Sequence, residues 1–150
     1  MNTRSTLIVP VLLALLLMAL PLRAERSHNE GGYTVHYNAI PTTALDAGVA
    51  RGYGITRSGS RALLNIAVLR QGVDEAEAQA VSAQVVAHVR SLTGQRNPVE
   101  LRELRDQDAI YYIGEFRIRG EENLRFELEV TPDDTTRPIR VRFEHFFVGE

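Results

Sequence analysis

The sequence predicts an all-β protein: an immunoglobulin-like antiparallel β-sandwich of about seven strands with one short helix. Two observations predict this fold. Several short segments alternate apolar and polar residues with a period of two, as half-buried strands do. Clusters of turn-forming residues separate these segments. The length fits a single β-sandwich domain, which we place at residues 32–150, after a flexible tail over residues 25–31.

The first elements are a strand and a short helix. The stretch YTVHYN, residues 33–38, alternates large apolar side chains with polar ones and therefore predicts a strand. Thr43, followed three residues later by Asp46, resembles a capping box. With Gly52 as a stop signal, this spacing predicts a short helix near residues 44–51.

Two strand segments are predicted around a turn at Ser58-Gly59, and the second, residues 62–69, is apolar enough to be central in a sheet. Residues 73–92 are ambiguous. The alternation of Ala and Val with polar residues after residue 80 favours a strand that only Val86 interrupts. Apolar residues spaced three or four apart favour an amphipathic helix instead, so periodicity leaves both the strand and the helix open. The apolar residues with this spacing are Val81, Val85, Val89 and Leu92.

The remaining elements are strands joined by turns. Residues 98–104 predict one strand, which a turn at 106–108 follows. Three further segments place large apolar side chains on one face each, and in the last two of them charged residues occupy the opposite face. They are residues 110–118, 124–130 and 139–143.

The first 24 residues have the pattern of a secretory signal peptide. Arg4 precedes an apolar run over residues 7–20, and Ala24 is a small residue at which cleavage can occur. The run is shorter than the ~20 residues of a membrane-spanning helix. We therefore expect export to the periplasm of a Gram-negative bacterium, with no stable membrane anchor after cleavage.

Composition excludes several classes of function. Without the leader, 15 arginines face 19 acidic residues, so we expect no nucleic-acid partner. The absence of cysteine excludes disulfides, thiolate catalysis and iron–sulfur clusters. No histidine spacing matches a known metal motif, and no nucleophile has an identifiable acid–base partner. We expect no catalytic residue, no metal site, no cofactor and no enzymatic activity.

Seven short elements of the sequence are together fairly specific: His36-Tyr37-Asn38, Arg57-Ser58, Leu64-Asn65, Leu92 to Gln95, Tyr111-Tyr112, Phe146-Phe147 and Gly149-Glu150. On these residues the chain resembles a family of small secreted proteobacterial proteins of unknown function. The resemblance covers about residues 31–150 and implies a periplasmic immunoglobulin-like sandwich. It also favours a strand over residues 80–92, while the Ala-Glu-Ala-Gln run leaves a helical turn open at 74–79.

A small set of polar residues is the candidate binding site. His36 and Asn38 share the face of their strand opposite to the apolar one. Asn is disfavoured in strands, which marks Asn65 as well. Arg57 can grip an anion, and His145 on the last strand can lie near His36. The candidates for binding are therefore His36, Asn38, Arg57, Asn65 and His145.

Two aromatic doublets indicate a partner surface. Adjacent strand residues face opposite sides, so Tyr111-Tyr112 and Phe146-Phe147 must each direct one ring outward. Our leading hypothesis is a non-enzymatic module that binds an envelope protein or peptide. The alternative is a small-molecule or metal-binding protein that uses the His36/Asn38 face. The sequence leaves the oligomeric state open.

Overall fold

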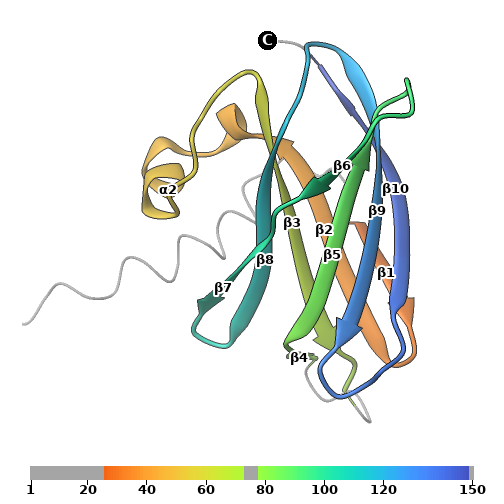
Figure 1. Ribbon diagram of the computed structural model, residues 1–150. Coiled ribbons are helices and arrows are strands. Elements are labelled where there is room, and N and C mark those ends of the chain that lie inside the picture. The colour runs from red at the N-terminus through yellow and green to blue at the C-terminus, as the bar shows by residue number, and fades with distance from the viewer. Residues whose placement is uncertain (1–25, 73–77, 149–150) are drawn as a thin grey trace, which may run out of the picture.

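The computed structural model describes residues 26–72 and 78–148, which form two antiparallel sheets packed face to face (Figure 1). Sheet A has the order β1-β2-β3-β8-β7, with β4 also paired to β3, and sheet B has the order β10-β9-β5-β6. Sheet A consists of β1 (Arg26–Glu30), β2 (Tyr33–Pro41), β3 (Arg61–Arg70), β4 (Gln79–Ala80), β7 (Arg102–Asp106) and β8 (Ala109–Arg117). Sheet B consists of β5 (Ala83–Arg90), β6 (Arg96–Val99), β9 (Glu122–Pro132) and β10 (Ile139–Phe147). The predicted all-β sandwich is confirmed.

The core lies between the sheets and is built by the alternation that the sequence shows. Phe126 of β9 is fully buried and stacks on Phe143 of β10, with ring centroids 4.6 Å apart. Phe116 of β8 meets Phe126 edge-on from the opposite sheet at 5.3 Å. Offset and edge-to-face ring pairs of this kind add to the free energy of apolar burial, so they fix how the two sheets face each other.

The predicted flexible tail at 25–31 is wrong for Arg26–Glu30, which form β1 and pair along their whole length with β2. The two strands are joined by Gly31 and Gly32, whose φ angles are +61° and +85°. A two-residue hairpin loop of type I′ requires positive φ at both positions, and glycine adopts it without strain. The Gly-Gly pair was therefore the sequence signal for β1.

The single strand predicted over 98–104 is also wrong, because the chain changes sheets within it. Residues up to Val99 pair with β5 in sheet B, and from Arg102 onward they pair with β8 in sheet A. The crossing passes over Gly114 of β8, where an added Cβ would lie 2.4 Å from the carbonyl oxygen of Glu100. Gly114 thus provides the space that lets one segment serve both sheets.

A short helical segment covers part of the outer face of sheet A (Figure 1). It contains the 3-10 turn η1 (Thr42–Ala44) and the helix α2 (Ala47–Gly52). Asp46 is the N-cap, and its carboxylate accepts from the amides of Gly48 and Val49, so Asp46 itself caps the helix in place of the predicted box. A second apolar cluster fills the space beneath: Leu45, Ala50, Ile55, Leu63 and Ile113.

The ambiguity at residues 80–92 is resolved as a strand. Residues 83–90 form β5 between β6 and β9, with Ala87 and Val89 buried and Val86 facing solvent. Gln79 lies in β4, while the helical turn considered for 74–79 falls mostly outside the described residues. No strand forms between residues 53 and 60, contrary to expectation; this segment is a loop anchored by the buried Thr42, whose hydroxyl accepts from the amide of Ser58 at 2.9 Å.

Candidate functional site

Three of the five predicted binding residues meet on the outer face of sheet A. Asn38 of β2 lies directly opposite Asn65 of β3, and His36 is on the same face one position along, opposite Ala67. This face is the one opposite the buried Val35, as the alternation predicts. The side-chain oxygen of Asn65 is buried and has no hydrogen-bond partner among the described residues.

His145 and Arg57 lie elsewhere. His145 belongs to the inward-facing row of β10 in sheet B, with its ring 4.5 Å from that of Phe147. Because sheet A lies between this row and the outer face that carries His36, the two histidines are not brought together. Arg57 donates to the carbonyl of Thr43 at 2.8 Å and ties the loop to η1. The expected proximity of His36 and His145 is therefore wrong.

Across residues 26–72 and 78–148, no three His, Cys, Asp or Glu side chains are grouped so that they could hold a metal ion. His28 contacts the carboxylate of the nearby Glu30 at 3.1 Å. No helix in the same ranges is long and apolar enough to cross a membrane.

The outer face of sheet B carries a dense array of charges, which we call the sheet-B face. Its side chains belong to the outward rows of β5, β6, β9 and β10. Among the described residues these rows hold five arginines against three glutamates, although the whole chain has a net charge of −2. They are Arg90, Arg96, Arg125, Arg140 and Arg142 with Glu127, Glu129 and Glu144. The face is thus basic on an acidic chain.

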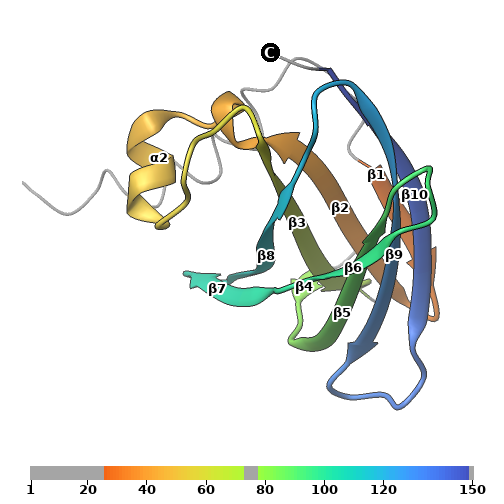
Figure 2. The same cartoon turned by 45° about the horizontal axis from the view of Figure 1, so that its top comes forward.

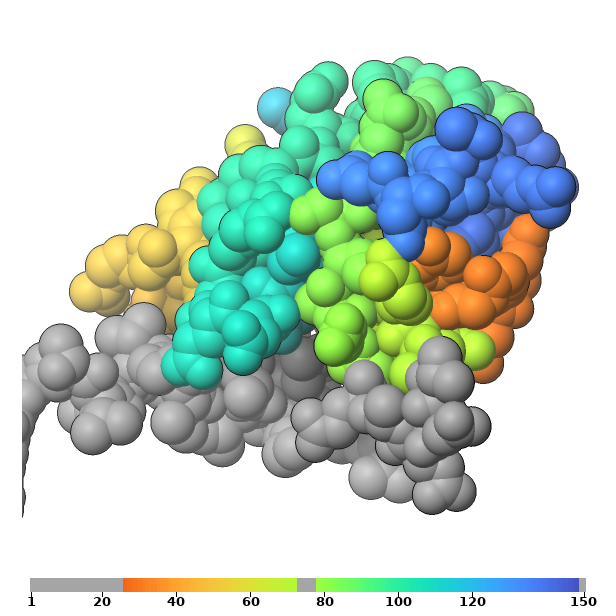
Figure 3. All heavy atoms as spheres, turned by 90° about the horizontal axis from the view of Figure 1, so that it is seen from below, coloured from red at the N-terminus to blue at the C-terminus, as the bar shows by residue number. Residues whose placement is uncertain are grey.

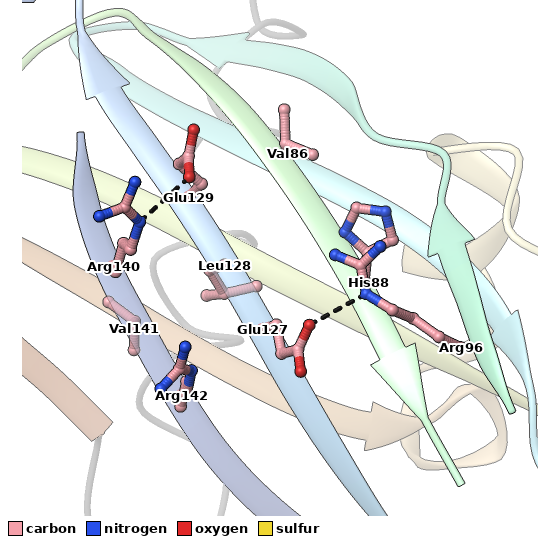
Figure 4. A pocket seen from close by; sticks show the side chains of 9 residues that line it. All are labelled: Val86, His88, Arg96, Glu127, Leu128, Glu129, Arg140, Val141 and Arg142. Atoms are coloured by element: carbon pink, nitrogen blue, oxygen red, sulfur yellow. Dashed lines mark hydrogen bonds and ion pairs between the residues drawn. The ribbon is translucent and has the colours of Figure 1, made fainter. Parts of the chain in front are cut away.

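Cross-strand pairs organise this face (Figure 4). Arg96 of β6 contacts Glu127 of β9 at 3.0 Å, and Arg140 of β10 contacts Glu129 at 3.3 Å. The hydrogen bond from Arg96 lowers the pKa of Glu127. The hydrogen bond from Arg125 likewise lowers the pKa of Glu144. Both carboxylates are therefore held in their charged form, and the pairing is regular along the strands.

Arg142 is the arginine of this face that is most available to a binding partner, because the other four form ion pairs with the glutamates. Its side chain is exposed, and no hydrogen bond or ion pair to another described residue fixes it. Two open depressions, of about 240 and 310 Å³, lie side by side on the face, and Arg142 and Glu127 line both. The depressions therefore form a continuous uneven track along β9 and β10.

The two aromatic doublets have different outcomes. Tyr111 points away from the main core as predicted, but it packs into the second apolar cluster beneath α2. Tyr112 is buried. Phe147 is 1% exposed while its neighbour Phe146 is 56% exposed at the end of the sheet-B face. Of the four rings in the two doublets, only that of Phe146 is thus exposed.

The sequence predicted charged outward rows for β9 and β10 but left β5 ambiguous, did not separate β6 from β7, and did not indicate the face as a site. The sequences IRVRFE in β10 and RFELE in β9 show the alternation. The register that aligns Arg142 with Glu127, and β9 with β5 on its other side, involves residues far apart in sequence. The available signal was the excess of arginine in the outward positions of these strands.

The family model described as a domain of unknown function (DUF4426) matches residues 27–149, so the chain belongs to this family. No curated protein matches the chain. A DUF4426 family protein from Pseudomonas aeruginosa has a similar crystal structure, with a TM-score of 0.72 and 25% sequence identity over 87% of this chain and 99% of that chain. The resemblance to a family of unknown function is confirmed.

Two more distant structures share the fold. FetP of uropathogenic Escherichia coli strain F11, expressed in the periplasm of E. coli, has a TM-score of 0.60 and 11% identity over 85% of this chain and 95% of that chain. A copper-bound variant of Campylobacter jejuni P19 has a TM-score of 0.57 and 10% identity over 83% of this chain and 96% of that chain. At these identities the likeness concerns the fold alone.

Proposed function

We propose that this member of the DUF4426 family is an exported, non-enzymatic module whose sheet-B face binds an acidic segment of an envelope protein. One observation carries the proposal: five arginines and three glutamates share an uncovered face of a chain whose net charge is −2. A basic face attracts acidic polypeptides over a distance of about a Debye length and orients them.

The shape of the face favours a polypeptide over a small molecule. Small-molecule sites are concave and enclose most of the ligand. The two depressions here are open and lie along adjacent strands. Arginine and aromatic residues are enriched at protein interfaces, and this face ends in the exposed ring of Phe146. An extended acidic segment lying across the sheet-B face would meet both features.

Export to the periplasm is part of the proposal. The leader-like residues 1–24 support it, as does the lack of cysteine, which leaves no thiol to oxidise there. The test is N-terminal sequencing of the protein recovered from a periplasmic extract. A mature chain beginning close to Glu25 is expected, and an intact leader in the membrane fraction would contradict export.

Binding can be tested with fluorescently labelled polyglutamate and the purified mature chain. We expect saturable binding that weakens as salt is added, because exposed charges are screened. The double variant Arg90→Gln/Arg96→Gln should weaken binding about tenfold, an effect typical of removing two charge-assisted contacts. The matched control Arg51→Gln/Arg117→Gln removes two exposed arginines outside the face and should bind like wild type. Equal losses in both variants would contradict a specific face.

A second candidate function is small-molecule or metal binding on the outer face of sheet A. The juxtaposition of Asn38 and Asn65, with the buried amide oxygen of Asn65, favours it. The copper-bound structures of P19 and of a FetP variant share the fold. The test is the metal content of the isolated protein and its thermal shift with Cu²⁺. A shift that His36→Ala abolishes would support this candidate, and zero metal with no shift would exclude it.

A further inference from the structure

β10 is the outermost strand of sheet B and has no neighbour on its far side in that sheet (Figure 2). It is nine residues long. The other outer strands of the two sheets are shorter and carry features that disfavour pairing, as natural edge strands usually do. β6 has four residues and contains Pro98. β1 and β7 have five residues each, all of them polar or charged in β1 and four of them charged in β7. β10 is therefore the edge best able to accept another strand.

Two independent contacts show which backbone groups β10 presents at this edge. Arg26 of β1 donates a side-chain hydrogen bond to the carbonyl of Glu144, so that carbonyl points away from β9. On the other side of sheet B, the amide of Asp133 donates to the carbonyl of Ser82. Along each strand, backbone groups point alternately toward one neighbouring strand and the other. Following this alternation from Asp133 across β9 to β10 with the observed registers also places the backbone groups of Glu144 on the side away from β9. The groups at the free edge belong to Arg140, Arg142, Glu144 and Phe146.

From this alternation we propose that β10 pairs antiparallel with β10 of a second copy of this chain, with Arg142 opposite Glu144 of that copy. A two-fold axis would pass at Phe143, so the same pair forms twice. In this register Arg140 also lies opposite Phe146 of the second copy, a cation–π arrangement. Every pair with free backbone groups is then charge-complementary or cation–aromatic.

The adjacent registers lack this complementarity. Shifting the axis by one residue to Arg142 places two arginines directly opposite each other. Shifting it the other way, to Glu144, places two glutamates opposite each other. Like charges at directly opposed positions destabilise a strand pair, so the sequence of β10 selects the register centred on Phe143.

Arg26 competes with this pairing. Its guanidinium lies 5.7 Å from the centre of the Phe143 ring and donates a hydrogen bond to the carbonyl oxygen of Glu144. In the proposed dimer that carbonyl accepts from the amide of Arg142 of the second copy, so Arg26 must turn away. The side chain of Arg26 therefore weakens the association without preventing it.

The pairing would join two sheet-B faces edge to edge into one eight-stranded surface. The inference goes beyond the proposed function, because the face of one copy can bind an acidic segment whether or not β10 is paired. Arg90 and Arg96, which test peptide binding, lie on β5 and β6, away from this edge. The two proposals can therefore fail separately.

The experiment is sedimentation velocity of the mature protein over a concentration series, with charge-reversed variants of β10. Arg142→Glu and Glu144→Arg should each weaken the dimer about fivefold or more, because each places like charges opposite each other twice. The double variant Arg142→Glu/Glu144→Arg restores opposite charges across the axis. It should therefore associate more strongly than either single variant. Arg26→Ala should strengthen association relative to wild type.

Both single variants also change the chain internally, since Glu144→Arg loses the ion pair with Arg125 and Arg142→Glu places a second carboxylate directly opposite Glu127. Circular dichroism therefore accompanies each measurement, and only folded variants are compared. The double variant carries both of these internal changes, so its recovery of association cannot come from restored stability. The proposal is overturned if wild type and Arg26→Ala stay monomeric at the highest concentration, or if the double variant associates no better than the single ones.

Discussion

The two long sides of the sandwich are closed by different means. On one side the main chain itself passes from β6 in sheet B to β7 in sheet A, against Gly114. On the other side β1 and β10 belong to different sheets, and side chains alone connect them, through Arg26 and the carbonyl of Glu144. The main-chain crossing leaves only the short edge strands β6 and β7 on its side. The Arg26 bridge on the other side can be released, and the edge of the longer strand β10 is then free.

At the lower end of this side, the loop between β9 and β10 (blue) lies against β1 and β2 (orange), as Figure 3 shows from below, and side-chain contacts connect the two sheets there as well. Asp134, in the loop between β9 and β10, accepts from the hydroxyl of Tyr33 of β2 at 2.6 Å. Arg70 of β3 forms an ion pair with the same carboxylate. These groups are solvent-exposed, so they join the sheets through polar contacts that pH can weaken. The β6–β7 side of this fold is therefore fixed by the path of the main chain, whereas the β1–β10 side is held by side-chain contacts that can be released.

The largest expected effect is on the crossing side, from Gly114→Ala. The added Cβ would lie 2.4 Å from the carbonyl oxygen of Glu100 and 2.9 Å from side-chain atoms of Val99 and Leu101. A backbone contact cannot move aside as a flexible side chain does, so we expect a loss of about 3 kcal/mol in the free energy of unfolding. Chemical denaturation measures it. Gly52→Ala, with nothing within 4 Å, is the control and should stay within ~0.5 kcal/mol of wild type.

The next effect comes from Tyr112→Phe on the same side. The Tyr112 hydroxyl accepts from the amide of Ala83 at 2.8 Å and donates to Glu103 of β7 at 3.1 Å. It therefore links the start of β5 to the edge of sheet A. Removing it leaves the buried amide without this partner, and we expect a loss of about 1–2 kcal/mol. Tyr53→Phe, whose hydroxyl makes no hydrogen bond to a described residue, is the matched control, and an equal loss there would contradict the argument.

The crossing side also marks the limit of prediction from sequence. The alternation of residues 110–118, 124–130 and 139–143 predicted their strands and their buried faces, because period two is a local property. The change of sheet between Val99 and Arg102 is not local. It depends on the space above Gly114. A glycine inside a strand indicates that another backbone segment passes close by, but it does not say which segment.

The candidate site was predictable in part for the same reason. The shared face of His36 and Asn38 follows from alternation, but its meeting with Asn65 needed the register of β2 against β3. The separation of His145 from His36 needed the assignment of β10 to sheet B. One ring of the Tyr111-Tyr112 doublet was predicted to face outward, and nothing in that segment showed that residues 45–55 would cover Tyr111.

A smaller effect is expected from Asp134→Asn, and it depends on pH. The hydrogen bond from Tyr33 and the ion pair with Arg70 lower the pKa of Asp134 below 3.8. A carboxyl whose pKa is lowered by folding binds fewer protons in the native state, so its contribution is present at neutral pH and lost as pH falls below about 4. Denaturation midpoints across an acid pH series should fall less steeply in the variant. The neighbouring Asp133→Asn should follow wild type, and identical slopes in all three proteins would refute the assignment.

The smallest effect on stability is expected from Arg26→Ala. This variant tests directly whether the β1–β10 side is held only by a side chain. An exposed cation above an aromatic ring contributes about 0.5–1 kcal/mol, so the free energy of unfolding should fall by no more than this. The contrast with Gly114→Ala would then be severalfold, since one side is held by the main chain and the other by a replaceable side chain. Denaturation at low protein concentration, where wild type and variant are both monomeric, measures the difference. A loss as large as that of Gly114→Ala would mean that Arg26 fastens β1 to β10 permanently, and the edge of β10 would then be closed.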